Sequence, residues 1–154
     1  MCIRDRFDIV SEVYSKDLKL VNGAKDYIIK SERNHFIGSN SNTDRILDGL
    51  KLVDLDEFFL SDQVYSFDMV KRPKPDPDIY LKVVNDNSLN IEETVIIEDS
   101  GVGVKAATAA GVRVFGLTAG KHWHLNRDTN ELFDNGALNV FSDYESLGRA
   151  IEEL

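Results

Sequence analysis

The stretch Val-Ile-Ile-Glu-Asp-Ser-Gly, residues 95–101, decides the fold of this chain. Its three apolar residues, two of them isoleucine, predict a short buried strand. Two carboxylates end that strand, and Ser100 then precedes a run of small residues that predicts a helix ending near Gly111. Because open α/β sheets bind ligands at the carboxyl ends of their strands, Glu98 and Asp99 are candidate site residues.

The adjacent acids Glu98 and Asp99 have two interpretations. Side by side at a strand end they repel each other unless a cation lies between them, which favours a divalent metal site. Alternatively, the strand passes into a turn with Ser100 as a helix N-cap, and both acids are solvated. Residues 95–101 taken alone leave both interpretations open.

The elements around this stretch predict a parallel α/β fold. A strand at 112–117 follows the predicted helix, and a strand–helix–strand unit of this length implies parallel strands with a right-handed crossover. Hydrophobic periodicity and turn residues place the remaining elements. Strands are expected at 35–38 and 138–141. Helices are expected at 7–20, at 24–31 and from Asn42 or Thr43 to Leu50. Two further helices are expected, one starting at Pro77 with Asp76 as its cap and one at 144–154 after a capping-box pattern at 142–145. The predicted fold class is a three-layer α/β domain with a Rossmann-like parallel sheet of four or five strands.

Composition excludes several classes of partner. The chain has 154 residues, of which 42% are hydrophobic, enough for one domain with a core. Its formal net charge of −9 argues against nucleic acid or an anionic membrane as the main partner. No apolar run reaches the ~20 residues of a membrane span. The single cysteine, Cys2, has no internal disulfide partner, so a cytoplasmic protein is expected.

Three loops are expected to meet at one edge of the sheet. Ser39 and Asn40 follow one strand, Lys74 lies in the proline-rich stretch 71–78, and Glu98 and Asp99 end the central strand. A hydroxyl, an ammonium and an acid pair suit phosphoryl transfer, because the charge on phosphoryl oxygens must be neutralised and oriented. The simpler alternatives are a turn serine and a solvated lysine. In the polar loop 118–130, His122 and His124 lack a third metal ligand, so we expect substrate contact or loop surface there, and packing by Trp123.

Three ordered motifs carry a family resemblance. They are Phe-Ile-Gly-Ser-Asn-Ser at 36–41, Lys-Pro-Asp-Pro-Asp-Ile-Tyr at 74–80, and Ile-Ile-Glu-Asp-Ser at 96–100, followed by Gly103, Ala106 and Ala107. Together they resemble the haloacid dehalogenase-like (HAD) hydrolase superfamily, and within it the sugar-phosphate phosphatase and β-phosphoglucomutase-like branch. The resemblance implies Mg²⁺-dependent hydrolysis of a small phosphorylated metabolite, a sugar phosphate, through an aspartyl-phosphate.

The same resemblance assigns roles to the candidate residues. Ser39 would hydrogen-bond the transferring phosphoryl group, with the Asn40 backbone N–H beside it. Lys74 would neutralise that group and the developing charge of the nucleophile. Asp99 would bind Mg²⁺, and Glu98 would be either a second ligand or an acid that supports the site without contacting the metal.

One family motif has no counterpart in this chain. The Asp-x-Asp strand that supplies the nucleophile and the general acid/base is not found before Phe7. Residues 1–6 are therefore expected to be a non-native leader, 7–20 a remnant of a cap helix and linker, and 21–154 the core domain. A truncated chain of this kind is expected to be inactive alone and to self-associate, because a missing central strand leaves backbone groups unpaired; the intact parent is expected to be a monomer.

The sequence leaves three alternatives to the phosphatase interpretation. A dehalogenase of the same superfamily needs no metal, and the acid pair Glu98-Asp99 disfavours it. A phosphomutase shares all these residues and differs in how its cap excludes water. The third alternative is a non-catalytic binding domain, or a fragment that pairs with another polypeptide.

Overall fold

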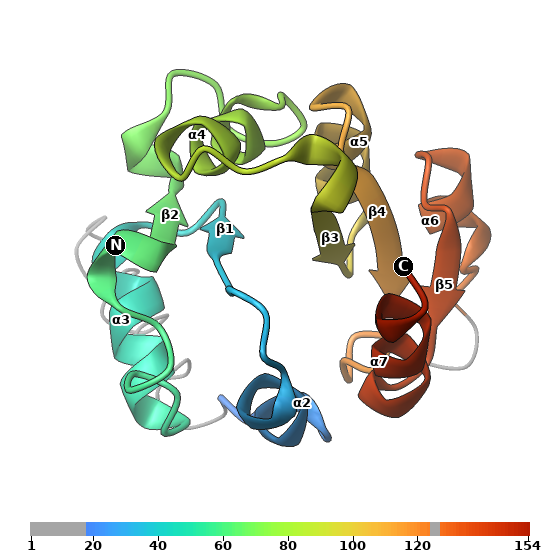
Figure 1. Cartoon of the computed structure of the whole chain (residues 1–154), viewed down its shortest axis with the longest axis horizontal. Coiled ribbons are helices and arrows are strands. Elements are labelled where there is room, and N and C mark those ends of the chain that lie inside the picture. The colour runs from blue at the N-terminus through green and yellow to red at the C-terminus, as the bar shows by residue number, and fades with distance from the viewer. Residues whose placement is uncertain (1–17, 124–126) are drawn as a thin grey trace, which may run out of the picture.

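The computed structural model describes residues 18–123 and 127–154, which form parallel strands in two sheets with helices packed around them (Figure 1). Strands β1 (Ile37–Ser39) and β2 (Val64–Ser66) form one sheet. Strands β3 (Val95–Glu98), β4 (Arg113–Leu117) and β5 (Asn139–Phe141) form the other, in the order β3-β4-β5. All three strand pairs are parallel, which confirms the predicted α/β class.

Helices connect the strands and cover the sheets. The α-helices are α2 (Ala24–Lys30), α3 (Thr43–Leu52), α4 (Asp78–Asp86), α5 (Gly101–Ala109), α6 (Asn130–Asp134) and α7 (Tyr144–Glu152), and the 3₁₀ turns are η1 (Ser61–Gln63), η2 (Phe67–Met69) and η3 (Ile91–Glu93). In Figure 1, α3 lies beside the β1–β2 sheet, α6 and α7 lie beside β5, and α4 lies over β1 and β2.

The β3–α5–β4 unit follows directly from its sequence. The Ser100 side chain accepts a hydrogen bond from the Gly103 N–H at 3.1 Å and so caps α5. The small side chains of Ala106 and Ala107 are fully buried, which lets α5 lie close to the sheet. Gly111 then adopts a φ of +74°, a left-handed conformation that ends the helix and costs glycine little.

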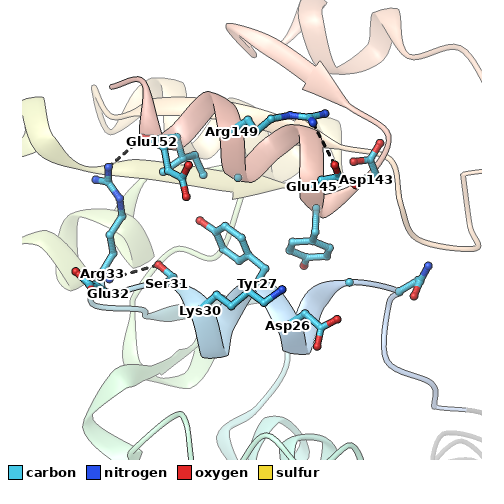
Figure 2. Close-up of a pocket in the computed structure, with 15 residues that line it drawn as sticks. Asp26, Tyr27, Lys30, Ser31, Glu32, Arg33, Asp143, Glu145, Arg149 and Glu152 are labelled. Carbon is cyan, nitrogen blue, oxygen red and sulfur yellow. Dashed lines mark hydrogen bonds and ion pairs between the residues drawn. The ribbon is translucent and has the colours of Figure 1, made fainter.

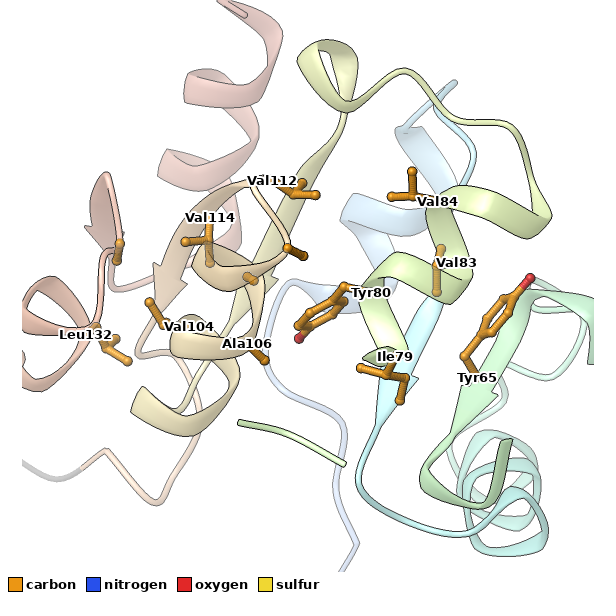
Figure 3. Close-up of a cluster of buried hydrophobic side chains, with 13 residues drawn as sticks. Tyr65, Ile79, Tyr80, Val83, Val84, Val104, Ala106, Val112, Val114 and Leu132 are labelled. Atoms are coloured by element: carbon orange, nitrogen blue, oxygen red, sulfur yellow. The ribbon is translucent and has the colours of Figure 1, made fainter. Parts of the chain in front are cut away.

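One hydrophobic cluster joins the two sheets. Figure 3 shows Ile79 and Tyr80 of α4 between Tyr65 of β2 on one side and Val104 and Val114 on the other. Two smaller clusters lie under α3 and under α7. Because α4 contacts β1, β2 and α5, its apolar face holds the two halves of the molecule together.

The two sheets are separated between β1 and β3. In the described part of the chain no ladder joins these strands, so each presents one unpaired edge. Ile37 and Gly38 of β1 and Ile97 and Glu98 of β3 line the same hollow, whose volume is about 860 Å³. The family resemblance predicted a sheet that lacks a central strand, and the described strands are interrupted between β1 and β3.

Helix α2 packs against α7 through aromatic contacts. The ring centroids of Tyr27 and Tyr144 lie 5.6 Å apart, and the Arg33 guanidinium donates to the Ile151 carbonyl at 2.9 Å. Figure 2 shows the open groove between the two helices, where acidic and basic side chains alternate. Five acidic and three basic side chains line the groove, and its drawn ion pair joins Arg149 to Glu145 within α7 at 3.1 Å.

Several predicted details were wrong. Strand β2 and helix α6 were not predicted, because each is short and lies in a stretch without clear periodicity. Helix α4 begins at Asp78 with Pro77 as N-cap, so Asp76 is not its cap and instead pairs with Arg72 at 3.2 Å. The N-cap of α7 is Asp143 rather than Ser142. The predicted helix at 7–20 and the leader at 1–6 fall almost wholly outside the described residues.

His35 is a partly buried titratable group that we expect to make the stability of this fold depend on pH. Its Nε2 atom is buried without a hydrogen-bond partner among the described residues, and its ring packs edge-on against Tyr27 and Phe59. Burial lowers the pKa of His35 below its usual value near 6.5, so the unfolded chain binds a proton more readily than the folded chain. The free energy of unfolding should therefore decrease as the pH falls below about 6.5, the pKa of an ordinary histidine.

We expect His35→Phe to raise the free energy of unfolding by about 1 kcal/mol, since it removes a buried unpaired nitrogen and keeps the ring contacts. It should also flatten the decline in stability between pH 7 and pH 5. Urea unfolding of both proteins at the two pH values tests this. An unchanged decline in the variant would show that other groups cause it.

Candidate functional site

The predicted site residues lie together at the carboxyl ends of β1 and β3. The same hollow of about 860 Å³ is lined by all five of them: Ser39, Asn40, Lys74, Glu98 and Asp99. Two different sheets and the loop before α4 contribute these residues. The structure therefore brings three sequence-distant motifs to one place, although the chemical role of each remains a prediction.

Lys74 is fixed at both its backbone and its ammonium group. The Asn40 side chain accepts from the Lys74 N–H at 3.0 Å and donates to the Lys74 carbonyl at 3.1 Å. The Lys74 Nζ donates to the Gly38 carbonyl at 2.9 Å and pairs with Glu98, while the Tyr80 ring lies 4.7 Å away. Only 9% of the Lys74 side chain is exposed, so its charge is held in one position.

Glu98 is the buried partner that holds Lys74. Its carboxylate is 8% exposed and accepts from Lys74 Nζ and the Tyr80 hydroxyl, and from the Asp99 N–H at 3.1 Å and Ser100 Oγ at 3.2 Å. Burial, followed by the charge of Glu98, raises the pKa of Tyr80 far above its usual value, so this phenol remains a donor. With four donors around it, Glu98 has little capacity left for a metal ion.

Gly103 makes room for this carboxylate. A Cβ atom at position 103 would overlap the carboxyl group of Glu98, so only glycine fits in the first turn of α5 here. The helix therefore begins directly over the buried acid, and the close approach explains why glycine stands within an otherwise alanine-rich helix.

Asp99 is the accessible acid of the pair. Its side chain is 58% exposed, and its Oδ2 lies 3.3 Å from His122 Nε2. Partial burial by neighbouring residues, and secondly the charge of Glu98, raise the pKa of Asp99. Within residues 18–123 and 127–154, no group of three His, Cys, Asp or Glu side chains is placed to hold a metal. One free carboxylate still suits Mg²⁺, which takes one or two carboxylates together with substrate phosphate oxygens.

Ser39 faces the hollow with a donor available. Its Oγ accepts from the Ser41 N–H at 3.1 Å, which fixes the hydroxyl oxygen at the end of β1. Among the described residues no acceptor takes the hydroxyl hydrogen, which leaves it for an anionic ligand. Ser39, Lys74 and Asp99 thus offer a neutral donor, a fixed cation and an open carboxylate around one space.

Sequence reasoning missed two residues of this site. Tyr80 was not among the predicted site residues, yet its hydroxyl donates to Glu98; the need of a buried phenol for a partner was the available signal. Trp123 was expected only to pack, but its Nε1 donates to the Asp99 carbonyl at 2.9 Å. His122 reaches Asp99, whereas His124 lies outside the described residues.

Comparison with known proteins identifies the family. The sequence profile of the haloacid dehalogenase-like hydrolases matches residues 2–117. The chain belongs to this family. No helix in the described part of this HAD-like chain is long and apolar enough to cross a membrane.

Three relatives illustrate the similarity of this HAD-like chain. A phosphorylated carbohydrates phosphatase from Thermotoga maritima is 34% identical over 139 residues, which cover 88% of this chain and 61% of the relative. A solved haloacid dehalogenase-like protein of unknown function from Agrobacterium tumefaciens has a TM-score of 0.89 at 29% identity, covering 98% of this chain and 68% of that one. A solved candidate β-phosphoglucomutase from Thermotoga maritima has a TM-score of 0.78 at 30% identity, covering 94% and 65%. The HAD-like chain thus spans about two thirds or less of the lengths of these relatives.

Proposed function

We propose that the protein to which this chain belongs is an Mg²⁺-dependent phosphatase of small phosphorylated metabolites, most specifically of sugar phosphates. The observation that carries the proposal is the fixed ammonium of Lys74, which lies between Gly38 and Glu98 and shares one hollow with Ser39 and Asp99. The curated relative that acts on phosphorylated carbohydrates supports the substrate class. Such substrates, and the acidic chain, support a cytoplasmic enzyme that uses neither nucleic acid nor membrane as substrate.

Each residue has a distinct task in this proposal. Ser39 Oγ and the Asn40 N–H orient the phosphoryl oxygens, and Lys74 neutralises their charge. Asp99 holds Mg²⁺, which when bound adds positive charge at the same oxygens. Glu98 holds Lys74 in place through their ion pair and does not itself contact the reacting groups. An aspartate outside the described residues attacks phosphorus while the ester P–O bond breaks and the sugar alcohol leaves with a proton. Water then hydrolyses the aspartyl-phosphate, which releases inorganic phosphate and restores the carboxylate.

A p-nitrophenyl phosphate assay tests this function. We expect no turnover by the 154-residue chain with Mg²⁺, because the Asp-x-Asp strand that the family resemblance calls for as the source of the nucleophile is not found before Phe7. A longer chain that carries an Asp-x-Asp strand ahead of residue 7 should turn over the substrate, lose activity with a chelator, and lose about 100-fold with Asp99→Ala.

Two outcomes of this assay would contradict the proposal. Chelator-sensitive turnover by the 154-residue chain that Asp99→Ala abolishes would reveal a nucleophile within it. An inactive longer chain would favour a non-catalytic binding domain instead.

A phosphomutase is the second candidate function. The solved candidate β-phosphoglucomutase supports it, because its fold matches nearly all of this chain. The two functions differ in whether water reaches the aspartyl-phosphate. Incubating the longer chain with β-glucose 1-phosphate separates them, since release of inorganic phosphate indicates a phosphatase and formation of glucose 6-phosphate indicates a mutase.

A further inference from the structure

Trp123 contacts the backbone of the exposed acid Asp99. Its Nε1–H donates to the main-chain carbonyl of Asp99 at 2.9 Å. Its ring packs against the large hydrophobic cluster that joins the two sheets. The indole is therefore held firmly by the core and carries a donor to the residue proposed to bind metal.

A second series of contacts holds the backbone two residues after Asp99, at Gly101. The Arg127 guanidinium lies 4.0 Å from the Trp123 ring centroid and pairs with Glu131 at 3.0 Å. Glu131 Oε1 in turn accepts from the backbone N–H of Gly101 at 3.2 Å. The backbone around Asp99 is thus fixed at the carbonyl of residue 99 and at the amide of residue 101.

This backbone restraint matters because the Asp99 side chain has little restraint of its own. Its carboxylate is 58% exposed, and His122 at 3.3 Å is the one side-chain partner that the described residues provide. Glu98, by contrast, is held by four hydrogen-bond donors. A metal ligand that is not preorganised by its own contacts depends on its supporting residues for affinity.

We propose that Trp123 is a positioning residue for Asp99, which it orients through the main-chain carbonyl, with Arg127 stacked on the indole as its support. This inference rests on the proposed function, because it takes Asp99 as the metal ligand. It assigns to the loop after β4 a part in metal binding that neither His122 nor His124 indicated from the sequence.

Terbium luminescence tests the inference without any catalytic assay. Tb³⁺ is a hard cation that binds carboxylate oxygens, and Trp123 is the single tryptophan of the chain. Tb³⁺ bound at Asp99 should therefore emit when the tryptophan is excited, and Asp99→Asn should remove this emission. Affinity is then measured by direct excitation of Tb³⁺, so that variants without tryptophan can be compared.

Trp123→Phe keeps an aromatic ring for Arg127 and the core but lacks the N–H group. We expect it to weaken Tb³⁺ binding by about 10-fold. Tyr65→Phe is the matched control, because it also removes one hydrogen bond from an aromatic ring, the 2.8 Å bond from Asn87, at a residue that does not line the hollow. Its affinity should equal that of the unmodified chain even if its melting temperature falls.

The outcomes distinguish the proposed metal-binding role of Asp99 from the proposed positioning role of Trp123. If Asp99→Asn removes Tb³⁺ binding and Trp123→Phe leaves the affinity unchanged, the positioning role is overturned and the metal site stands. If Asp99→Asn leaves the sensitised emission unchanged, or the unmodified chain gives none, the metal assignment of Asp99 is overturned together with the inference. A 10-fold loss of Tb³⁺ affinity in Trp123→Phe, with unchanged affinity in Tyr65→Phe, supports both the metal site at Asp99 and the positioning role of Trp123.

Discussion

Lys74→Met should lower the free energy of unfolding by about 3–5 kcal/mol, although it changes a residue proposed for catalysis rather than one of the apolar core. The substitution keeps the aliphatic stem and removes the ammonium. The Glu98 carboxylate, 8% exposed, then stays buried without its cationic partner. Removing one member of a buried ion pair is costly because the remaining charge is desolvated and uncompensated.

Chemical denaturation of matched variants tests this expectation. Lys82→Met is the control, because Lys82 forms an exposed ion pair with Asp86 at 2.9 Å and should lose less than about 1 kcal/mol. Adding Glu98→Gln to Lys74→Met should restore part of the lost stability, since the unpaired charge is then gone. Equal losses for Lys74→Met and Lys82→Met would show that the buried pair does not contribute to stability.

Gly103→Ala should destabilise the protein by about 3 kcal/mol, at the upper end of what overpacking costs. Alanine is normally the better helix former by about 1 kcal/mol, so propensity alone predicts the opposite sign. The destabilisation follows because the new methyl group would overlap the Glu98 carboxyl and displace it from Lys74 and Tyr80.

Two comparisons isolate this overlap. Gly148→Ala lies inside α7, where the new Cβ meets the Tyr27 ring at an ordinary 3.4 Å, and it should be neutral or stabilising. In a Glu98→Ala background the overlap is absent, and Gly103→Ala should then stabilise as well. Thermal melts of these four proteins measure the effect; a destabilising Gly103→Ala in the Glu98→Ala background would exclude Glu98 as the cause.

The sequence predicted the central unit well because its signals are local. The apolar run before Glu98, the cap at Ser100 and the glycine at 111 each act within a few residues, and β3, α5 and β4 follow from them. Strand β2 was missed because its three residues carry no alternation and are buried by packing under α3 and α4.

Within the candidate site, residue identities were predictable but their partnerships were not. Parallel strand ends bring Ser39, Lys74 and Asp99 to one edge, which is a rule of topology. The sequence does not distinguish Glu98 from Asp99, because neighbouring side chains on a strand point to opposite faces and only packing decides which becomes buried. Trp123 reaches Asp99 from another loop, and no spacing rule relates the two positions.

The separation of β1 from β3 has a consequence for how the molecule opens. Across the described residues the two sheets share side-chain contacts through α4 but no main-chain ladder. The β1–β2 half with α3 can therefore undergo local unfolding while the β3–β4–β5 half keeps every one of its ladder hydrogen bonds. We expect the amide protons of the two halves to exchange as separate cooperative units, with those of the smaller β1–β2 ladder exchanging with solvent first.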